Sequence, residues 1–503
     1  MKNQLYYGDN LDVLRRYIKD ETVDLCYIDP PFNSKRNYNQ IYTNTGKEDK
    51  AQAQAFIDTW TWDDYANQGL AEIQSNYNGV FTSQSIDLIE GLTKVLKKGS
   101  LLAYLVSMTL RIAEIHRVLK PTGSFYLHCD PTASHYLKLV LDAVFCTRGG
   151  DFKNEIIWHY SGWNAKLNES FSKRHDVILF YTKNTRQIFN SYSIPYNSEA
   201  EYVKLRKQKI LTDEDGKKYV LSDAGGGKRV KRYVDEAMEY GKPVSDVWVL
   251  DKINNSSKER LGYPTQKPEA LLERIIKASS NEGDTVLDAY CGCGTTVAVA
   301  EKLKRHWIGI DITYQSISLI LKRLEEHNPD SLANIELNGV PKDFDSAKAL
   351  ANKQDDRTRK EFEKWMVLTY SKNQAIIHEK KGGDEGIDGI AYIVHNKAQD
   401  TKKVLFSVKS NKTLTPAVVR ELNGTVERDQ AACGILLTLY PMPNLVKESK
   451  KYGLYHNEFT DNDYPKIQVI SVEEMFNGSV IELPNVMKVL RKAEQHAEQS
   501  DLL

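Results

Sequence analysis

This sequence has few cysteines, no long apolar run and no excess of charge of either sign. Its six cysteines include no Cys-x-x-Cys pair in 503 residues, which argues against a disulfide framework and favours free thiols in a reducing compartment. The longest apolar run, around residues 101–110, is too short to span a bilayer. The first residues lack the basic and apolar regions of a secretory signal. We therefore expect a soluble cytoplasmic protein without membrane contact.

Charge is balanced overall, with 68 Lys and Arg against 68 Asp and Glu, so any nucleic-acid footprint must be local. One local excess of positive charge lies between Val203 and Tyr233, a range with ten Lys and Arg but only four Asp and Glu. It belongs to a charged, Tyr-rich segment, 184–250, with a flexible centre at 224–227. A solvated insertion is one interpretation. Its place within a catalytic core and its tyrosines favour a DNA-contacting module.

The remaining pattern alternates strands and helices, which predicts an α/β fold with a parallel sheet. Predicted strands cover 4–9, 23–28, 124–129, 155–160, 176–182, 285–289 and 306–310, and helices cover 10–17, 85–119 with a break near 99, 133–145, and stretches from 269 and 295. The polar residues 33–80 are expected to form a long loop or lid. Residues 338–358 are polar without a strong period, so we expect a linker before a separate α+β domain at 359–503.

The motif Asp29-Pro30-Pro31-Phe32 directly follows the predicted strand 23–28. Proline fixes φ and lacks an N–H, so the motif forms a stiff loop at the carboxyl end of the strand, where open α/β sheets bind ligands. A carboxylate and a proline carbonyl can accept both hydrogens of a flat NH2 group while Phe32 stacks on its ring. The competing interpretation is an ordinary proline turn.

A second motif, Asp288-Ala289-Tyr290-Cys291-Gly292-Cys293-Gly294, joins a strand to a helix through a glycine-rich turn. Asp311 closes the next strand 19 residues after Gly292, near the roughly 20-residue spacing of a ribose-binding carboxylate. Val297 stands where a dinucleotide site would have its third glycine, so a cofactor without a pyrophosphate fits better. We interpret the two cysteines as small turn residues and not as metal ligands.

Together these motifs resemble the β-class S-adenosylmethionine-dependent amino DNA methyltransferases, in which the catalytic motif precedes the cofactor motif. The likeness extends through 8–9, 117–123, 154–183 and 263–269, over roughly the first 340 residues, and includes solitary methylases and type III modification subunits. It implies a Rossmann-like class I methyltransferase fold with circularly permuted motif order. The methyltransferase domain would cover 1–337, with 184–250 as an inserted target-recognition region.

The resemblance also implies roles for individual residues. The residues expected to line the methionine and ribose end of the cofactor are Asp288, Tyr290, Gly292, Gly294 and Thr295. Asp311 would bind the ribose hydroxyls and Asp9 would lie near the adenine edge. The run Gln266-Lys267-Pro268 would close over the methionine.

The implied reaction is methylation of a flipped base in double-stranded DNA. If Asp29 and the Pro30 carbonyl accept both N–H groups of the target amine, its lone pair can face the methyl group, while the flipped base stacks on Phe32. In this family an acid before the two prolines accompanies adenine N6, and Ser accompanies cytosine N4. Asp29 therefore favours adenine, with cytosine N4 as the alternative. Methylation of protein glutamine or RNA is a further, less favoured possibility.

The last third holds another constellation of acidic and basic residues. Glu363 lies on a predicted helix, Asp388 enters a strand after Gly383-Asp384-Glu385-Gly386, and Lys409 ends the next strand. This resembles Mrr-like nucleases of the PD-(D/E)XK fold, in which carboxylates hold Mg²⁺ and a lysine activates water. We expect Asp388 and Lys409 to be catalytic, and Asp388 and Glu363 to bind Mg²⁺.

Ser407 departs from the nuclease pattern, which usually has Glu or Gln at that position. The leading hypothesis is restriction-modification in one chain of a bacterium or archaeon. The alternative is an orphan or regulatory methylase whose C-terminal domain only binds DNA. A homodimer or a separate restriction subunit is compatible with both.

Overall fold

The computed structural model describes most of the chain. The described residues are 2–31, 36–44, 47–58, 60–162, 171–254, 257, 259–261, 263, 265–352, 356–371, 375–377, 386–397 and 400–484, with the backbone alone at 36–44, 47–58 and 356–359. Within these ranges, every helix is too short or too polar to cross a bilayer.

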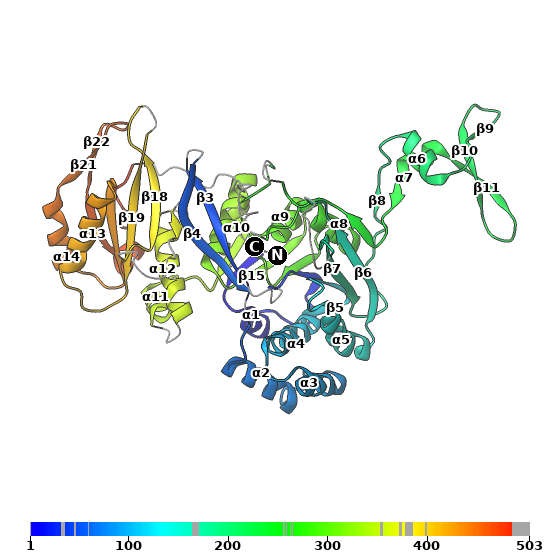
Figure 1. Ribbon diagram of the computed structural model, residues 1–503, viewed down its shortest axis with the longest axis horizontal. Coiled ribbons are helices and arrows are strands. Elements are labelled where there is room, and N and C mark those ends of the chain that lie inside the picture. The colour runs from blue at the N-terminus through cyan, green and yellow to red at the C-terminus, as the bar shows by residue number, and fades with distance from the viewer. Residues whose placement is uncertain are drawn as a thin grey trace.

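A nine-stranded sheet forms the centre of the larger part (Figure 1). Its strands are, in spatial order, β13 (Val247–Val249), β6 (Asp151–His159), β7 (His175–Thr182), β5 (Leu119–Cys129), β2 (Val23–Ile28), β14 (Thr285–Asp288), β15 (His306–Asp311), β1 (Asn3–Tyr7) and β16 (Ile335–Asn338). The α/β class is confirmed. The expectation of a parallel sheet is wrong in one respect, because β7 runs antiparallel to β5 and β6. Consecutive strands can pair antiparallel without a crossover, and strand spacing alone does not reveal direction.

Helices cover both faces of this sheet. One face packs against α1 (Asn10–Tyr17), α2 (Asp64–Ser75), α3 (Ser83–Leu96), α4 (Ser100–Val118) and α5 (Ser134–Phe145), and the other against α8 (Glu269–Ser279), α9 (Thr295–Lys302) and α10 (Tyr314–His327). The burial of strand β2 explains why its sequence is apolar except at Asp24. Leu25 and Tyr27 face the second set of helices, while Cys26 and Ile28 face the first, so both sides of the strand are buried.

The insertion predicted at 184–250 largely forms an arm that projects from the body (Figure 1). The arm, defined here as residues 193–243, contains β8 (Ser193–Ile194), α6 (Glu199–Arg206), β9 (Leu211–Thr212), β10 (Lys218–Asp223), β11 (Arg229–Tyr233), α7 (Val234–Tyr240) and β12 (Lys242–Pro243). Tyr202, Val220 and Val234 form a small core of its own. The chain then rejoins the main sheet at β13, which pairs with β6.

A second, five-stranded sheet forms the smaller part. Its order is β17 (Ile376–Ile377), β18 (Gly389–Val394), β19 (Thr401–Lys409), β20 (Cys433–Thr438) and β23 (Ile467–Ser471). Strand β18 is antiparallel to β17 and β19, whereas β19, β20 and β23 are parallel. The accompanying elements are α12 (Asp356–Tyr370), α13 (Ala417–Arg428), α14 (Pro443–Ser449), α15 (Val472–Phe476) and the hairpin β21 (Leu454–Asn457) with β22 (Asn462–Pro465).

Two segments differ from the expectation of irregular chain. Residues 33–80 include the hairpin β3 (Arg36–Asn44) and β4 (Lys47–Asp58) and the helix α2. The expected linker 338–358 contains α11 (Phe344–Ala351) and the start of α12. Asp343 and Ser346 form a capping box at the start of α11, and Ala347 and Ala351 are buried. Two turns of helix present too few apolar positions to show a period.

The two parts meet at α12, where Glu361 contacts the main sheet. Its buried carboxylate accepts the backbone N–H of Tyr314 at 2.9 Å and the Tyr7 hydroxyl at 3.5 Å, and Lys364 donates to it at 3.0 Å. Tyr314 begins α10 and Tyr7 ends β1. The helix that opens the smaller part therefore caps a helix of the larger one.

Candidate active site

Four carboxylates gather at one edge of the main sheet. Asp29 follows β2, Asp288 ends β14, Asp311 ends β15, and Asp9 lies just beyond β1. These strands are neighbours and run parallel, so their carboxyl ends meet at the same edge. The connection from β14 leads to β15 on one side, and that from β2 leads to β5 on the other. The two predicted motifs thus meet at the switch point, where such sheets bind ligands.

The glycine-rich turn lies directly after β14. Gly292 and Gly294 have φ of +49° and +75°, which favours glycine. The N–H of Gly292 donates to Asp311 at 2.9 Å. A Cβ on Gly294 would lie 2.6 Å from Ile320 on α10, and one on Gly292 would lie 3.4 Å from the Tyr263 ring. Both glycines therefore allow a close approach that a side chain would block.

The carboxylates beside this turn are buried. Asp288 accepts hydrogen bonds from the Thr296 hydroxyl at 2.5 Å and from the Tyr290 N–H at 3.0 Å. Burial raises the pKa of Asp288 to about 7, and the charges of Asp29 and Asp311 add to this rise against those hydrogen bonds. Burial also raises the pKa of Asp311, opposed by hydrogen bonds from Thr313 and Gly292. A ligand with positive charge or hydroxyl donors would relieve this crowding of acids.

Asp29 pairs with Lys267, a residue that the sequence analysis had assigned to the cofactor. The Lys267 ammonium donates to Oδ2 of Asp29, and both side chains are largely buried. Oδ1 of Asp29 is buried and has no hydrogen-bond partner among the described residues. Pro30 is buried and Pro31 half-buried, while Phe32 lies outside the described residues. Lys267, predicted over the methionine, thus contacts Asp29 of the Asp-Pro-Pro-Phe motif.

The flanking residues of Lys267 hold its segment in place. Gln266 accepts the N–H of Leu261 at 2.8 Å and donates to the Glu259 carbonyl at 2.5 Å, so its side chain closes a loop. Pro268 is the N-cap residue of α8.

Buried arginines anchor the other predicted positions. Arg111 donates to Asp9 at 2.9 Å, and Asp9 also caps α1 through the Leu11 N–H. Arg323 donates to the Thr295 hydroxyl at 3.2 Å and to Glu269 at 2.7 Å. Sequence reasoning missed both arginines. For Arg111 a signal was available, because a lone arginine among the apolar residues of α4 needs a partner. Arg323 follows Lys322 and precedes two glutamates, so it gave no such signal.

A polar network that the sequence did not predict occupies the same edge, on the β5–β7 side of β2. His128 contacts the Tyr27 hydroxyl at 2.9 Å through Nδ1 and Asp176 at 3.2 Å through Nε2. The Tyr160 hydroxyl donates to Asp176 at 3.1 Å, and the Lys252 ammonium lies 3.7 Å from the centre of the Tyr160 ring. Burial raises the pKa of Asp176, but His128, Lys267 and Lys252 outweigh it and lower this pKa to about 2. Asp29 therefore lies between the glycine turn and this polar network.

The nuclease-like residues come together only in part. The N–H of Asp388 donates to the Phe406 carbonyl at 2.8 Å, and Oδ2 of Asp388 accepts the Val408 N–H at 2.7 Å. Lys409 ends β19, with its ammonium 3.6 Å from where a Cβ on Gly386 would lie. Ser407 donates to the Gly386 carbonyl at 2.6 Å, which occupies its hydroxyl proton.

The predicted metal ligands of this region remain a prediction. Glu363 lies on α12 and is half-buried. No group of three or more His, Cys, Asp or Glu side chains suited to a metal ion occurs among the residues whose placement is described. Asp384 and Glu385 lie outside those residues.

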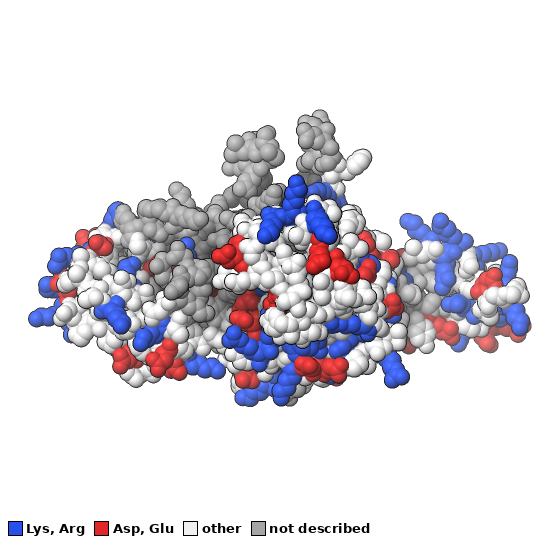
Figure 2. All heavy atoms as spheres, turned by 90° about the horizontal axis from the view of Figure 1, so that it is seen from below, with Lys and Arg blue, Asp and Glu red and all other residues white. Residues whose placement is uncertain are grey.

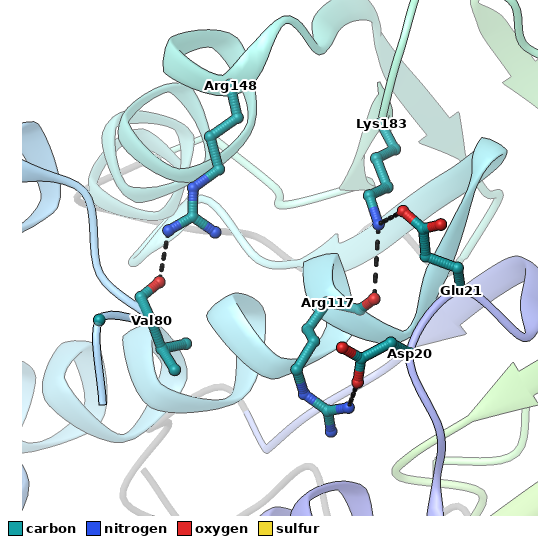
Figure 3. Close-up of a pocket in the computed structure, with 7 residues that line it drawn as sticks. Asp20, Glu21, Val80, Arg117, Arg148 and Lys183 are labelled. Atoms are coloured by element: carbon teal, nitrogen blue, oxygen red, sulfur yellow. Dashed lines mark hydrogen bonds and ion pairs between the residues drawn. The ribbon is translucent and has the colours of Figure 1, made fainter.

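A separate surface pocket lies at the opposite edge of the sheet (Figure 3). Its lining residues are Asp20, Glu21, Gly79, Val80, Arg117, Arg148 and Lys183. The charges there are largely satisfied: Lys183 pairs with Glu21 at 3.2 Å, Arg117 pairs with Asp20, and Arg148 donates to the Val80 carbonyl. This pocket is therefore no part of the carboxylate edge.

The family follows from this fold and site together with a family comparison. Residues 23–322 match the family described as DNA methylase, and the chain belongs to that family. Residues 355–451 match a second family, described as restriction endonuclease. The predicted combination of a methyltransferase with an Mrr-like domain is confirmed.

Individual relatives agree with this assignment. The chain is 45% identical over 323 residues to the type II methyltransferase M2.LlaDCHI of Lactococcus lactis subsp. cremoris, covering 64% of this chain and 89% of the relative. It is 26% identical over 337 residues to the DNA adenine methyltransferase YhdJ of Escherichia coli (strain K12), covering 66% and 87%. The solved M1.HpyAVI–SAM complex is 18% identical, with a TM-score of 0.34, over 64% of this chain and 98% of that one.

Proposed function

We propose that this protein methylates the exocyclic N6 of adenine in double-stranded DNA, with S-adenosylmethionine as methyl donor. The observation that carries the proposal is the position of Asp29, on the strand adjacent to β14 and its glycine turn. An acceptor for a target amine and a cradle for a cofactor thereby share one sheet edge. The relative named as a DNA adenine methyltransferase, and Asp at position 29, favour adenine over cytosine.

The residues at the carboxylate edge fit this cofactor. The bare backbone of Gly292 and Gly294 permits close approach, and the buried Asp288 carboxylate and the half-buried Asp311 lie beside this turn. We assign Asp311 to the ribose hydroxyls and Asp9 to the adenine edge. The methionine and ribose end is assigned to Asp288, Tyr290, Gly292, Gly294 and Thr295. When bound, S-adenosylmethionine supplies a methyl group on a positively charged sulfur, which the neighbouring acids favour.

The chain's own residues act on the target amine. Asp29 and the Pro30 carbonyl accept its two N–H groups, which frees the nitrogen lone pair and stabilises the positive charge that develops there. The base reaches this position only if it leaves the duplex stack. Phe32 then stacks on it, and its edge lies toward the polar network of Tyr27, His128 and Asp176.

The arm is proposed to bind the DNA around the target. Arg229, Lys231 and Arg232 on β11 are exposed, and Figure 2 shows Lys and Arg along one side of the arm. Such side chains neutralise phosphates and position the duplex.

Tritium transfer from labelled S-adenosylmethionine to duplex DNA, followed by mass spectrometry of the nucleosides, tests the proposal. We expect N6-methyladenine from the wild type, and a loss of at least about 100-fold in rate for Asp29→Asn. Unchanged cofactor binding in this variant would show that the loss is chemical. Recovery of N4-methylcytosine alone would reassign the target base.

We further propose that the smaller part cleaves DNA with Mg²⁺. The restriction endonuclease match over 355–451 and the proximity of Asp388 to the β19 residues before Lys409 favour this second function. Asp388 and Glu363 would hold the ion, which would supply charge stabilisation at the phosphodiester. Lys409 would orient water beside it.

Unmethylated plasmid incubated with the protein and Mg²⁺ tests this activity. We expect cutting that Asp388→Ala and Lys409→Ala each abolish while methylation continues. Intact plasmid under all conditions would assign the domain to DNA binding alone.

A further inference from the structure

The two carboxylate oxygens of Asp29 have different environments. Oδ2 accepts the Lys267 ammonium, whereas Oδ1 is buried and has no partner among the described residues. A buried acceptor without a partner destabilises the folded protein, and more so when the group is charged. Oδ1 is therefore the oxygen available to a donor that arrives with the substrate.

Lys267 lies between the two halves of the site. Its charge acts on Asp176 in the polar network and on Cys293 in the glycine turn. Without a cation at this point, Asp29 would face Asp288 and Asp176 unopposed. Like charges in such a space repel, so the Asp29 side chain would be driven from its present position.

The segment that presents Lys267 is rigid. The next residue is Pro268, which restricts the Lys267 backbone to extended conformations and caps α8. The first residue of α8, Glu269, pairs with buried Arg323 at 2.7 Å, and Gln266 closes the preceding loop. Gln266, Pro268 and Glu269 thus hold the Lys267 backbone in the position from which its ammonium contacts Asp29.

We propose that Lys267 is a positioning residue for Asp29. It holds Oδ2 of the carboxylate and leaves Oδ1 as the oxygen that accepts the N–H of the target amine. This inference rests on the proposed methyltransferase function. It assigns Lys267 to the Asp29 carboxylate and no longer to the cofactor.

The test separates the turnover number from cofactor affinity in Lys267→Met and Lys267→Arg. We expect Lys267→Met to lower kcat about 100-fold, since misplacing a reacting group by about 1 Å costs that much. Its Kd for tritiated S-adenosylmethionine should stay within about threefold, because the contact is to Asp29. Lys267→Arg should recover much of kcat. Lys277→Met is the matched control, since Lys277 pairs with Glu273 on the outer part of α8.

Two kinetic results would overturn the inference. A raised Kd with unchanged kcat would return Lys267 to the cofactor. A faster Lys267→Met enzyme would show that the ammonium only competes with the target amine.

Thermal melting of Asp29→Asn, Lys267→Met and the double variant gives a readout independent of catalysis. If the two side chains are paired, either substitution alone breaks the pair. We therefore expect Lys267→Met to lower Tm by much less in the Asp29→Asn background than in the wild type. Additive losses would refute the pairing. A wild type that methylates no DNA would instead refute the proposed function, and the melting cycle would still decide whether the two side chains are coupled.

Discussion

Asp288→Asn should make the stability of the cofactor-free protein less sensitive to pH. The pKa of the buried carboxyl is about 7 in the folded protein, against an ordinary value of 3.8 for an aspartate in water. Each pKa unit corresponds to about 1.4 kcal/mol, so the protonated form is favoured by up to about 4 kcal/mol. Between about pH 4 and pH 7 the folded protein keeps a proton that the unfolded chain has released.

The sign of the effect follows from this difference in proton binding. Stability from Asp288 is fully present below about pH 4, falls as the pH rises through the window, and is lost above about pH 7. An asparagine of similar shape has no such loss. The variant should therefore gain up to about 4 kcal/mol over the wild type between about pH 4 and pH 8.

Urea unfolding of both proteins across this range, without cofactor, measures the difference. Asp87→Asn, on the exposed side of α3, is the control for an Asp-to-Asn change. Parallel stability curves for wild type and Asp288→Asn would refute the reasoning. The gain in stability should come with weaker S-adenosylmethionine binding, since a carboxylate near a cationic ligand is lost.

Three further changes test other parts of the molecule. Gly294→Ala places a Cβ 2.6 Å from a side-chain carbon of α10 at a φ of +75°, and should lower the unfolding free energy by about 2–3 kcal/mol in urea melts. Glu361→Ala removes the acceptor for the Tyr314 N–H, which should lower the unfolding free energy by about 3 kcal/mol. Calorimetry should then show two transitions, one for each part; a single unchanged transition would contradict the coupling. Replacing Lys231 and Arg232 by Ala should reduce the salt slope of DNA affinity by about 2 and leave cofactor affinity unchanged; an unaltered slope would remove these residues from the DNA contact.

Several features could be read from the sequence because they are local. Strand β2 has the predicted bounds, 23–28, and α1 covers the predicted 10–17. Mostly apolar runs that stop at Asp, Pro or Gly mark buried strands and their ends without knowledge of neighbours. The glycine turn and the helix after it followed for the same reason.

Other features depended on contacts between residues far apart in the chain. The direction of β7, the burial of α11 and the contact of Arg323 with Thr295 have no local signal. The position of Lys267 is the clearest case, because 237 residues separate it from Asp29 along the chain. The sequence alone determined which residue types stand at the ends of the strands. Only the order of strands in the folded sheet decided which charges meet, because an ion pair depends on distance in space and not along the chain.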